Sequence, residues 1–132
     1  MISVTRIGTG SAHRVTIGNH SLTVDLTDAD PSAGPDPHDL YDAALGACKA
    51  LTMLWYAQRH DIPLETISVT VDRDASEERT GRYRLDTALD IGGTLTDAQR
   101  AQLLRVAEHC PVHRLMTDVT TEISTRLVDP AG

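Results

Sequence analysis

The chain has 132 residues, 40% of them hydrophobic, a size suited to one domain around one core. Its net charge of −7, with scattered basic residues, argues against a nucleic-acid or anionic-membrane partner. No window approaches about 18 consecutive apolar residues, and the first residues do not resemble a signal peptide. We therefore expect a single soluble, cytoplasmic domain over residues 1–132.

The N-terminal part, residues 1–30, alternates polar and apolar residues in short runs. Val15 and Ile17 precede Gly18-Asn19 and a second alternating run follows, a pattern that predicts a β-hairpin. Residues 2–7 are expected to add a third strand. Between Thr27 and Pro37 the composition shifts to Asp, Ser, Ala, Gly and Pro, which predicts a loop.

Residues 36–61 are predicted to form one long central helix. Asp36 is a suitable N-cap, Pro37 suits the first helical position, and Asp39 adds a carboxylate near the positive helix end. Pro63 ends the helix shortly after His60. Three- and four-residue spacing predicts one buried apolar stripe, made of Leu40, Ala44, Ala47, Cys48, Leu51 and Trp55.

The C-terminal half is expected to continue with strands and a second helix. Alternation over residues 66–92 predicts two antiparallel strands joined by a charged connection. Thr96 and Gln99 form a capping box for a helix over 96–110, which Pro111 breaks or kinks and which has Cys110 on its buried face. Residues 118–128 alternate clearly and predict a final strand. The fold class is therefore α+β.

The two cysteines, Cys48 and Cys110, are too few for a disulfide scaffold in a cytoplasmic protein. Three interpretations stay open at this point: small core side chains, reactive thiols, or ligands of a zinc ion. A zinc site would combine Cys110, His109 and His113 with Cys48 or His38, but the sequence supplies no clean second pair of ligands.

A reactive thiol requires a group that lowers its pKa. Lys49 is adjacent to Cys48 but points about 100° round the helix, so we do not count it as that group. A surface role is expected for Lys49. His113 follows Cys110 by three residues and is a candidate neighbour of that thiol. Cys48 lies in the middle of its helix, where the helix dipole gives it little help.

Two blocks together resemble the OsmC/Ohr family of osmotically inducible and organic hydroperoxide resistance proteins, and the resemblance covers nearly the whole chain. The blocks read GPDPHDLYDAALGACKALTMLWYAQRHDIPLE, which contains Cys48, and TLTDAQRAQLLRVAEHCPVHRLM, which contains Cys110. The resemblance implies an α+β OsmC-like fold, with antiparallel sheets packed around a long central helix and a second helix. It also implies an intertwined homodimer with active sites at the subunit interface.

By this resemblance, Cys48 matches the peroxidatic cysteine and Cys110 the resolving cysteine of a thiol peroxidase. The implied substrate is an alkyl or lipid hydroperoxide. No bound cofactor or metal is implied; an external dithiol reductant, such as a lipoylated protein, would reopen the Cys48–Cys110 disulfide.

The auxiliary residues depart from the family's reductases. A glutamate that holds an arginine against the thiolate is replaced here by His38, while Asp39 matches the acidic residue of the broader OsmC-like group. Arg14, with Arg6 behind it, is the candidate for the arginine, and His113 is a further candidate site residue. These departures favour an alternative, a dimeric binding or stress-associated protein with little or no turnover.

Overall fold

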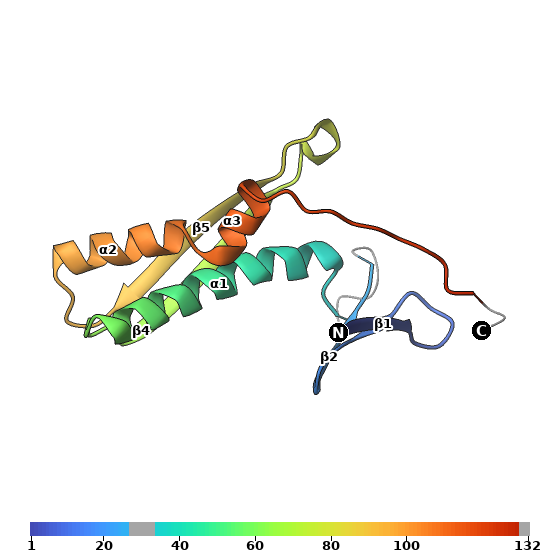
Figure 1. Ribbon diagram of the computed structural model, residues 1–132, viewed down its shortest axis with the longest axis horizontal. Helices are drawn as coiled ribbons and strands as arrows, with labels where there is room; N and C mark the ends of the chain where they lie inside the picture. Colours follow the sequence, from blue (N-terminus) through green and yellow to red (C-terminus); the bar gives the residue numbers. More distant parts are fainter. Residues whose placement is uncertain (27–33, 130–132) are drawn as a thin grey trace.

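A computed structural model of the chain describes residues 1–26 and 34–129. Most of the loop predicted between residues 27 and 37 lies outside these described residues. The described part combines helices with antiparallel strands, so the predicted α+β class is confirmed (Figure 1).

The N-terminal residues form a three-stranded antiparallel sheet, as predicted. Its strands are β1 (Ile2–Arg6), β2 (His13–Ile17) and β3 (His20–Val24), in the order β1-β2-β3. Ile17 pairs with His20 across the two-residue turn Gly18-Asn19, and Gly18 has the positive φ of 57° that such turns favour. Figure 1 shows this sheet beside the start of α1.

Helix α1 (Pro37–Arg59) begins as its sequence predicts. The Asp36 side chain accepts a hydrogen bond from the backbone N–H of Asp39, and the Asp39 side chain accepts one from the N–H of Asp36. This reciprocal pair satisfies two amides that have no partner inside the helix. His60 is the C-cap.

The buried face of α1 differs from the predicted stripe. Ala44, Ala47, Leu51 and Trp55 are exposed, with 65% exposure at Leu51. Gly46 faces the sheet, where an added Cβ would lie 3.1 Å from a Val71 methyl group. A small residue at this position therefore lets helix and strand approach closely. The residues of α1 that are buried are Asp42, Leu45, Gly46, Lys49, Met53 and Ala57.

Strands β4 (Thr66–Asp74) and β5 (Arg84–Gly92) form the predicted antiparallel pair. They are in register from Thr66↔Gly92 to Asp74↔Arg84, and a short 3-10 turn, η1 (Glu78–Thr80), lies in the connection. Helix α1 contacts β4, α2 and α3 (Figure 1). The core between these elements consists of Met53, Ala57, Ile62, Leu103 and Ala107.

Helix α2 (Asp97–Glu108) starts with the predicted Thr96–Gln99 capping box. The chain then continues into a third helix, α3 (Pro111–Thr117), which the sequence analysis did not predict. Cys110 is the N-cap of α3 and Pro111 occupies its first position, where a missing N–H costs nothing. Pro111 therefore starts a new helix.

The predicted strand over 118–128 is not formed in the described chain. After α3, residues 120–129 have no regular secondary structure and extend toward the side where the N-terminal sheet lies (Figure 1). Ile123 is 82% exposed and Leu127 96% exposed. The alternating pattern is present, but these residues pair with no strand of the described chain.

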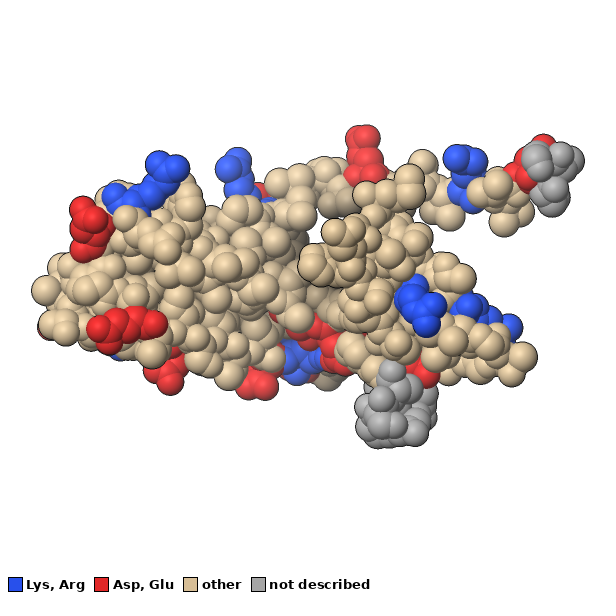
Figure 2. All heavy atoms as spheres, turned by 90° about the horizontal axis from the view of Figure 1, so that it is seen from below, with Lys and Arg blue, Asp and Glu red and all other residues tan. Residues whose placement is uncertain are grey.

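Charged side chains are dispersed over the face drawn in Figure 2, where basic and acidic groups alternate in small patches. The expectation from net charge that the chain has no nucleic-acid partner is not tested by this distribution and stays a prediction. Within residues 1–26 and 34–129, no helix combines the length and apolar character needed to cross a membrane.

Candidate functional site

Cys48 lies half-buried in the middle of α1, opposite the start of α3. The backbone N–H of Val112, in the first turn of α3, donates to the Cys48 sulfur at 3.4 Å. One turn further along α1, the Thr52 hydroxyl lies 3.9 Å from the same sulfur. The Cys48 thiol thus has an amide donor from a helix 64 residues away in sequence.

Cys110 is fully buried and is not disulfide-bonded. Burial raises the pKa of its thiol, the backbone N–H of His113 lowers it, and a hydrogen bond with Cys48 raises it again. A bond that raises the pKa of Cys110 is one in which Cys110 keeps its proton and donates it toward Cys48. The two thiols are therefore neighbours.

An apolar groove opens beside Cys48. Its volume is about 560 Å³, and its walls are Cys48, Leu51, Thr52, Trp55 and Pro111. The Trp55 ring is covered on one side by the Arg59 guanidinium, 4.7 Å from the ring centroid. This groove suits an alkyl group better than a small polar molecule.

The structure corrects the prediction for Lys49, which is buried rather than on the surface, with 3% exposure. Its ammonium donates to the Ala107 carbonyl at 2.8 Å and lies 2.9 Å from Nδ1 of His113. An ammonium can only donate, so Nδ1 of His113 is the acceptor. The Lys49 side chain therefore links α1 to His113 of α3. The backbone N–H of His113 in turn reaches Cys110.

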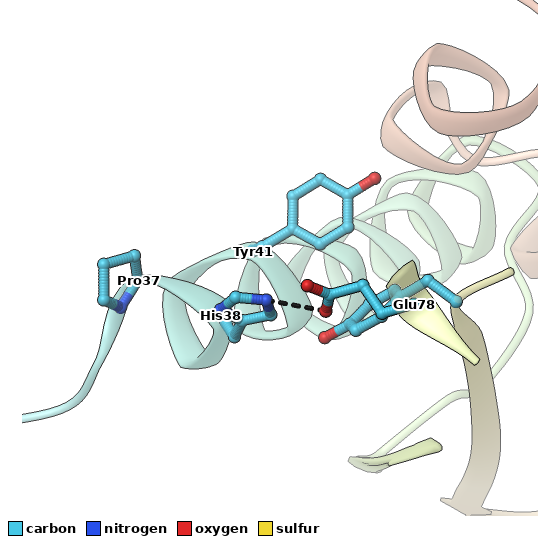
Figure 3. A pocket seen from close by; sticks show the side chains of 5 residues that line it. Pro37, His38, Tyr41 and Glu78 are labelled. Atoms are coloured by element: carbon cyan, nitrogen blue, oxygen red, sulfur yellow. Dashed lines mark hydrogen bonds and ion pairs between the residues drawn. The ribbon is translucent and has the colours of Figure 1, made fainter. Parts of the chain in front are cut away.

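His38 lies away from the thiols. Ten residues separate it from Cys48 on α1, which is about 15 Å along the helix axis. Its Nε2 pairs instead with Glu78 at 2.8 Å, in η1 of the β4–β5 connection (Figure 3). A cavity of about 390 Å³ lies there, lined by Pro37, His38, Tyr41, Glu78 and Tyr83.

Asp39 belongs to a charged cluster around Arg73 of β4. Arg73 makes an ion pair with Asp39, and its Nε lies 2.9 Å from Asp42; a third carboxylate, that of Asp36, is 3.8 Å away. Although burial alone would lower it, the hydrogen bond to Asp39 and the charge of Asp42 raise the pKa of Arg73. This cluster fastens the start of α1 to the sheet.

Tyr83 completes the cluster. Its hydroxyl donates to Asp42 at 2.6 Å. Burial, together with this hydrogen bond, raises the pKa of Tyr83 to about 12. The phenol therefore stays protonated over the whole physiological range.

Arg14, the other auxiliary candidate, lies exposed on β2 in the N-terminal sheet. The contacts of Cys48 within the described residues come from α1 and the start of α3, and Arg14 is not among them. Likewise, the described residues contain no group of three His, Cys, Asp or Glu side chains arranged to hold a metal ion. His109, one of the proposed ligands, is exposed and bonds the Arg105 carbonyl.

Sequence analysis missed three contributors to the site: Thr52, the Val112 amide and the buried ammonium of Lys49. The spacing of four between Cys48 and Thr52 places both on one helix face and was the signal available for Thr52. The role of Val112 depends on α3, a helix that was not predicted.

Comparison with known proteins agrees with this architecture. Residues 27–124 match the family model described as OsmC-like protein. No curated protein matches the chain significantly in sequence.

Similar solved structures span most of the chain. An OsmC-like protein from Mycoplasma pneumoniae has 17% identity and a TM-score of 0.73, with 90% of this chain and 89% of that chain covered. An organic hydroperoxide resistance protein OsmC from Legionella pneumophila has 25% identity and a TM-score of 0.59, covering 89% and 90%. The organic hydroperoxide resistance protein OhrB of Bacillus subtilis has 24% identity and a TM-score of 0.56, covering 89% and 91%. The family match spans well over half of the sequence and the neighbours share its fold, so the chain belongs to the OsmC-like protein family.

Proposed function

We propose that the protein is a thiol peroxidase that reduces organic hydroperoxides through Cys48 and Cys110. The Cys48 thiolate attacks the terminal oxygen of ROOH, the O–O bond breaks, and the alkoxide takes up a proton and leaves as ROH. Cys48 is thereby oxidised to a sulfenic acid. Cys110 then attacks that sulfur, forming the disulfide and releasing water.

The observation that carries the proposal is the meeting of both thiols at the start of α3, where the Val112 amide donates to Cys48. Burial supports the order of the two roles. Cys48 is half-buried and borders a groove, whereas Cys110 is fully buried and burial raises the pKa of its thiol. The accessible sulfur therefore meets the peroxide, and the buried sulfur meets the sulfenic acid.

The groove beside Cys48 supports an alkyl or lipid hydroperoxide as substrate. Trp55, Leu51 and Pro111 supply an apolar wall next to the sulfur, which favours an organic chain over hydrogen peroxide. The Legionella and Bacillus structures, named as organic hydroperoxide resistance proteins, point in the same direction.

The cycle needs an external reductant, since the disulfide must be reopened by thiol–disulfide exchange. We propose a dithiol, such as the lipoyl group of a lipoylated protein, with no bound cofactor or metal. A cytoplasmic location fits this chemistry, because the compartment keeps such thiols reduced.

We further propose that the chain works as an intertwined homodimer. Leu51 and Trp55 form an exposed apolar face on α1, and Ile123 and Leu127 are exposed in an extended segment. A second copy would bury both. Gel filtration should report a dimer; a compact monomer at working concentration would contradict this part.

One observation favours a second candidate, a binding or stress-associated protein with little turnover. The carboxylates and the arginine nearest the start of α1 are paired with one another, and His38 is paired with Glu78. No guanidinium contacts Cys48 within the described residues.

Anaerobic stopped-flow mixing of the reduced protein with cumene hydroperoxide or hydrogen peroxide separates the two candidates. We expect rapid loss of two thiols per chain with cumene hydroperoxide and slower loss with hydrogen peroxide. Cys48→Ser should abolish the reaction, and Cys110→Ser should leave a sulfenic acid that a dimedone reagent traps. Thiol loss no faster than that of a free cysteine would instead support the binding protein.

A further inference from the structure

Lys49 is the only lysine in the sequence, and it is buried beside the two cysteines. The other 11 basic residues are arginines. Lysine is among the residues least often buried, because its ammonium is expensive to remove from water. A single lysine placed inside the protein is therefore an unusual feature. The proposed peroxidase steps involve Cys48 and Cys110 and assign no role to Lys49.

The charge of Lys49 is met by dipoles rather than by a carboxylate. Its two hydrogen-bond partners are the Ala107 carbonyl and the neutral acceptor Nδ1 of His113. None of the ion pairs found among the described residues includes Lys49. The ammonium thus contributes uncompensated positive potential in a poorly solvated place.

The titratable groups that face this charge come from two helices. Cys48 lies next to it on α1, while Cys110 and His113 lie at the start of α3. Lys49 lowers the pKa of the Cys110 thiol and so opposes the rise caused by burial. The anion that benefits from the ammonium is therefore a thiolate.

We propose that Lys49 is a positioning residue of the thiol pair, whose buried charge stabilises the Cys110 thiolate as that sulfur attacks oxidised Cys48. The inference rests on the proposed peroxidase cycle for its purpose. The Cys110 thiol gives up its proton, its sulfur forms the S–S bond, and the displaced hydroxide leaves with a proton as water. His113 holds the ammonium in place through Nδ1.

The first test isolates Cys110 in a Cys48→Ser background, where its ionisation is followed by thiolate ultraviolet absorbance. Lys49→Met removes the charge while keeping a side chain of similar length. We expect the Cys110 titration to move up by about one pH unit, a tenfold loss of thiolate near neutral pH. Lys49→Arg keeps the positive charge, so the midpoint of the Cys110 titration should stay where it is with Lys49. Arg100→Met, which removes an exposed charge on α2, is the matched control and should change nothing.

The second test measures the resolving step in the chain with both cysteines. After one equivalent of cumene hydroperoxide, disulfide formation in Lys49→Met should be about tenfold slower at neutral pH and should recover as pH rises. Sulfenic acid formation at Cys48 should change less. A merely structural role for Lys49 would slow both steps alike and would not restore the rate at high pH.

The outcomes separate this inference from the proposed function. An unchanged Cys110 titration in Lys49→Met overturns the role of Lys49, whatever the peroxidase assay reports. A shifted titration without hydroperoxide consumption overturns the peroxidase and leaves the electrostatic role standing.

A measurement on the unmodified chain covers the case in which the variants fail to fold. Labelling with ¹³C-lysine gives a single side-chain signal, that of Lys49. We expect this signal to shift at the pH where Cys110 ionises, and the shift to vanish in Cys110→Ser. A signal indifferent to the ionisation of Cys110 would overturn the inference.

Discussion

Two clusters on helix α1 each contain one cation, and they are built in opposite ways. At the start of the helix, Arg73 is surrounded by the carboxylates of Asp36, Asp39 and Asp42. In the middle, Lys49 meets a carbonyl and a neutral imidazole. A cation that is already paired with carboxylates holds two elements of the fold together. A cation without a carboxylate partner can instead stabilise an anion that forms during a reaction.

The largest stability effect is expected at Asp42, which binds both Arg73 and Tyr83 and is only 6% exposed. Asp42→Ala leaves the Tyr83 hydroxyl and one face of Arg73 without a partner. We expect a loss of about 2–3 kcal/mol in the free energy of unfolding, measured by urea denaturation. Asp72→Ala, at an exposed aspartate of β4, is the control and should cost at most about 0.5 kcal/mol. Equal losses in the free energy of unfolding for the two variants would show that Asp42 does not hold α1 against the β4–β5 sheet.

Tyr83 should give the same cluster a dependence on alkaline pH. Its pKa is raised from 10.0 to about 12, so the folded protein holds the phenol proton more tightly than the unfolded chain does. Its contribution is therefore fully present below about pH 10 and lost as pH rises from about 10 to 12. Urea titrations across this range should show a steeper decline for the unmodified chain than for Tyr83→Phe. Parallel declines would contradict the raised pKa.

Lys49→Met should have the opposite effect on stability to Asp42→Ala. Replacing a buried charge that lacks a carboxylate partner by an apolar side chain of similar length removes a desolvation cost. The Ala107 carbonyl keeps the backbone amides of His109 and Cys110 as donors. We expect the free energy of unfolding to stay the same or rise by up to about 1 kcal/mol. A marked loss of stability, measured by thermal or urea unfolding, would mean that Lys49 also stabilises the contact between helices.

The smallest effect is expected at His38. It forms an exposed pair with Glu78, with side-chain exposures of 46% and 43%. Pairs of this kind contribute little, so His38→Gln should change the free energy of unfolding by no more than about 0.5 kcal/mol. Alkylation of Cys48 should proceed at an unchanged rate. A slowed alkylation would place His38 within reach of the thiol after all.

Local signals in the sequence predicted local structure well. The capping boxes at Asp36 and Thr96, the Gly18-Asn19 turn and the alternation in 66–92 all led to the observed elements. In each case the physical cause lies within a few residues of the signal: a side chain caps its own helix, and a turn sets the register of its own hairpin.

Features that depend on distant partners were not predictable in the same way. Helix α1 is apolar on more than one side, so spacing alone could not tell that Met53 faces the core while Leu51 is exposed. The alternation after residue 118 marks residues able to form a strand, but pairing requires a partner. Lys49 was expected on the surface, where lysines usually lie, and only the approach of Ala107 and His113 gives it a place inside.

The position of the only lysine has a practical consequence for experiments on motion. Reagents that acylate side-chain amines find no exposed target on this chain. Acylation of Lys49 can therefore occur only when the junction of α1, α2 and α3 opens, and its rate measures that opening directly. The protein carries a built-in reporter of local unfolding at the place where its two thiols meet.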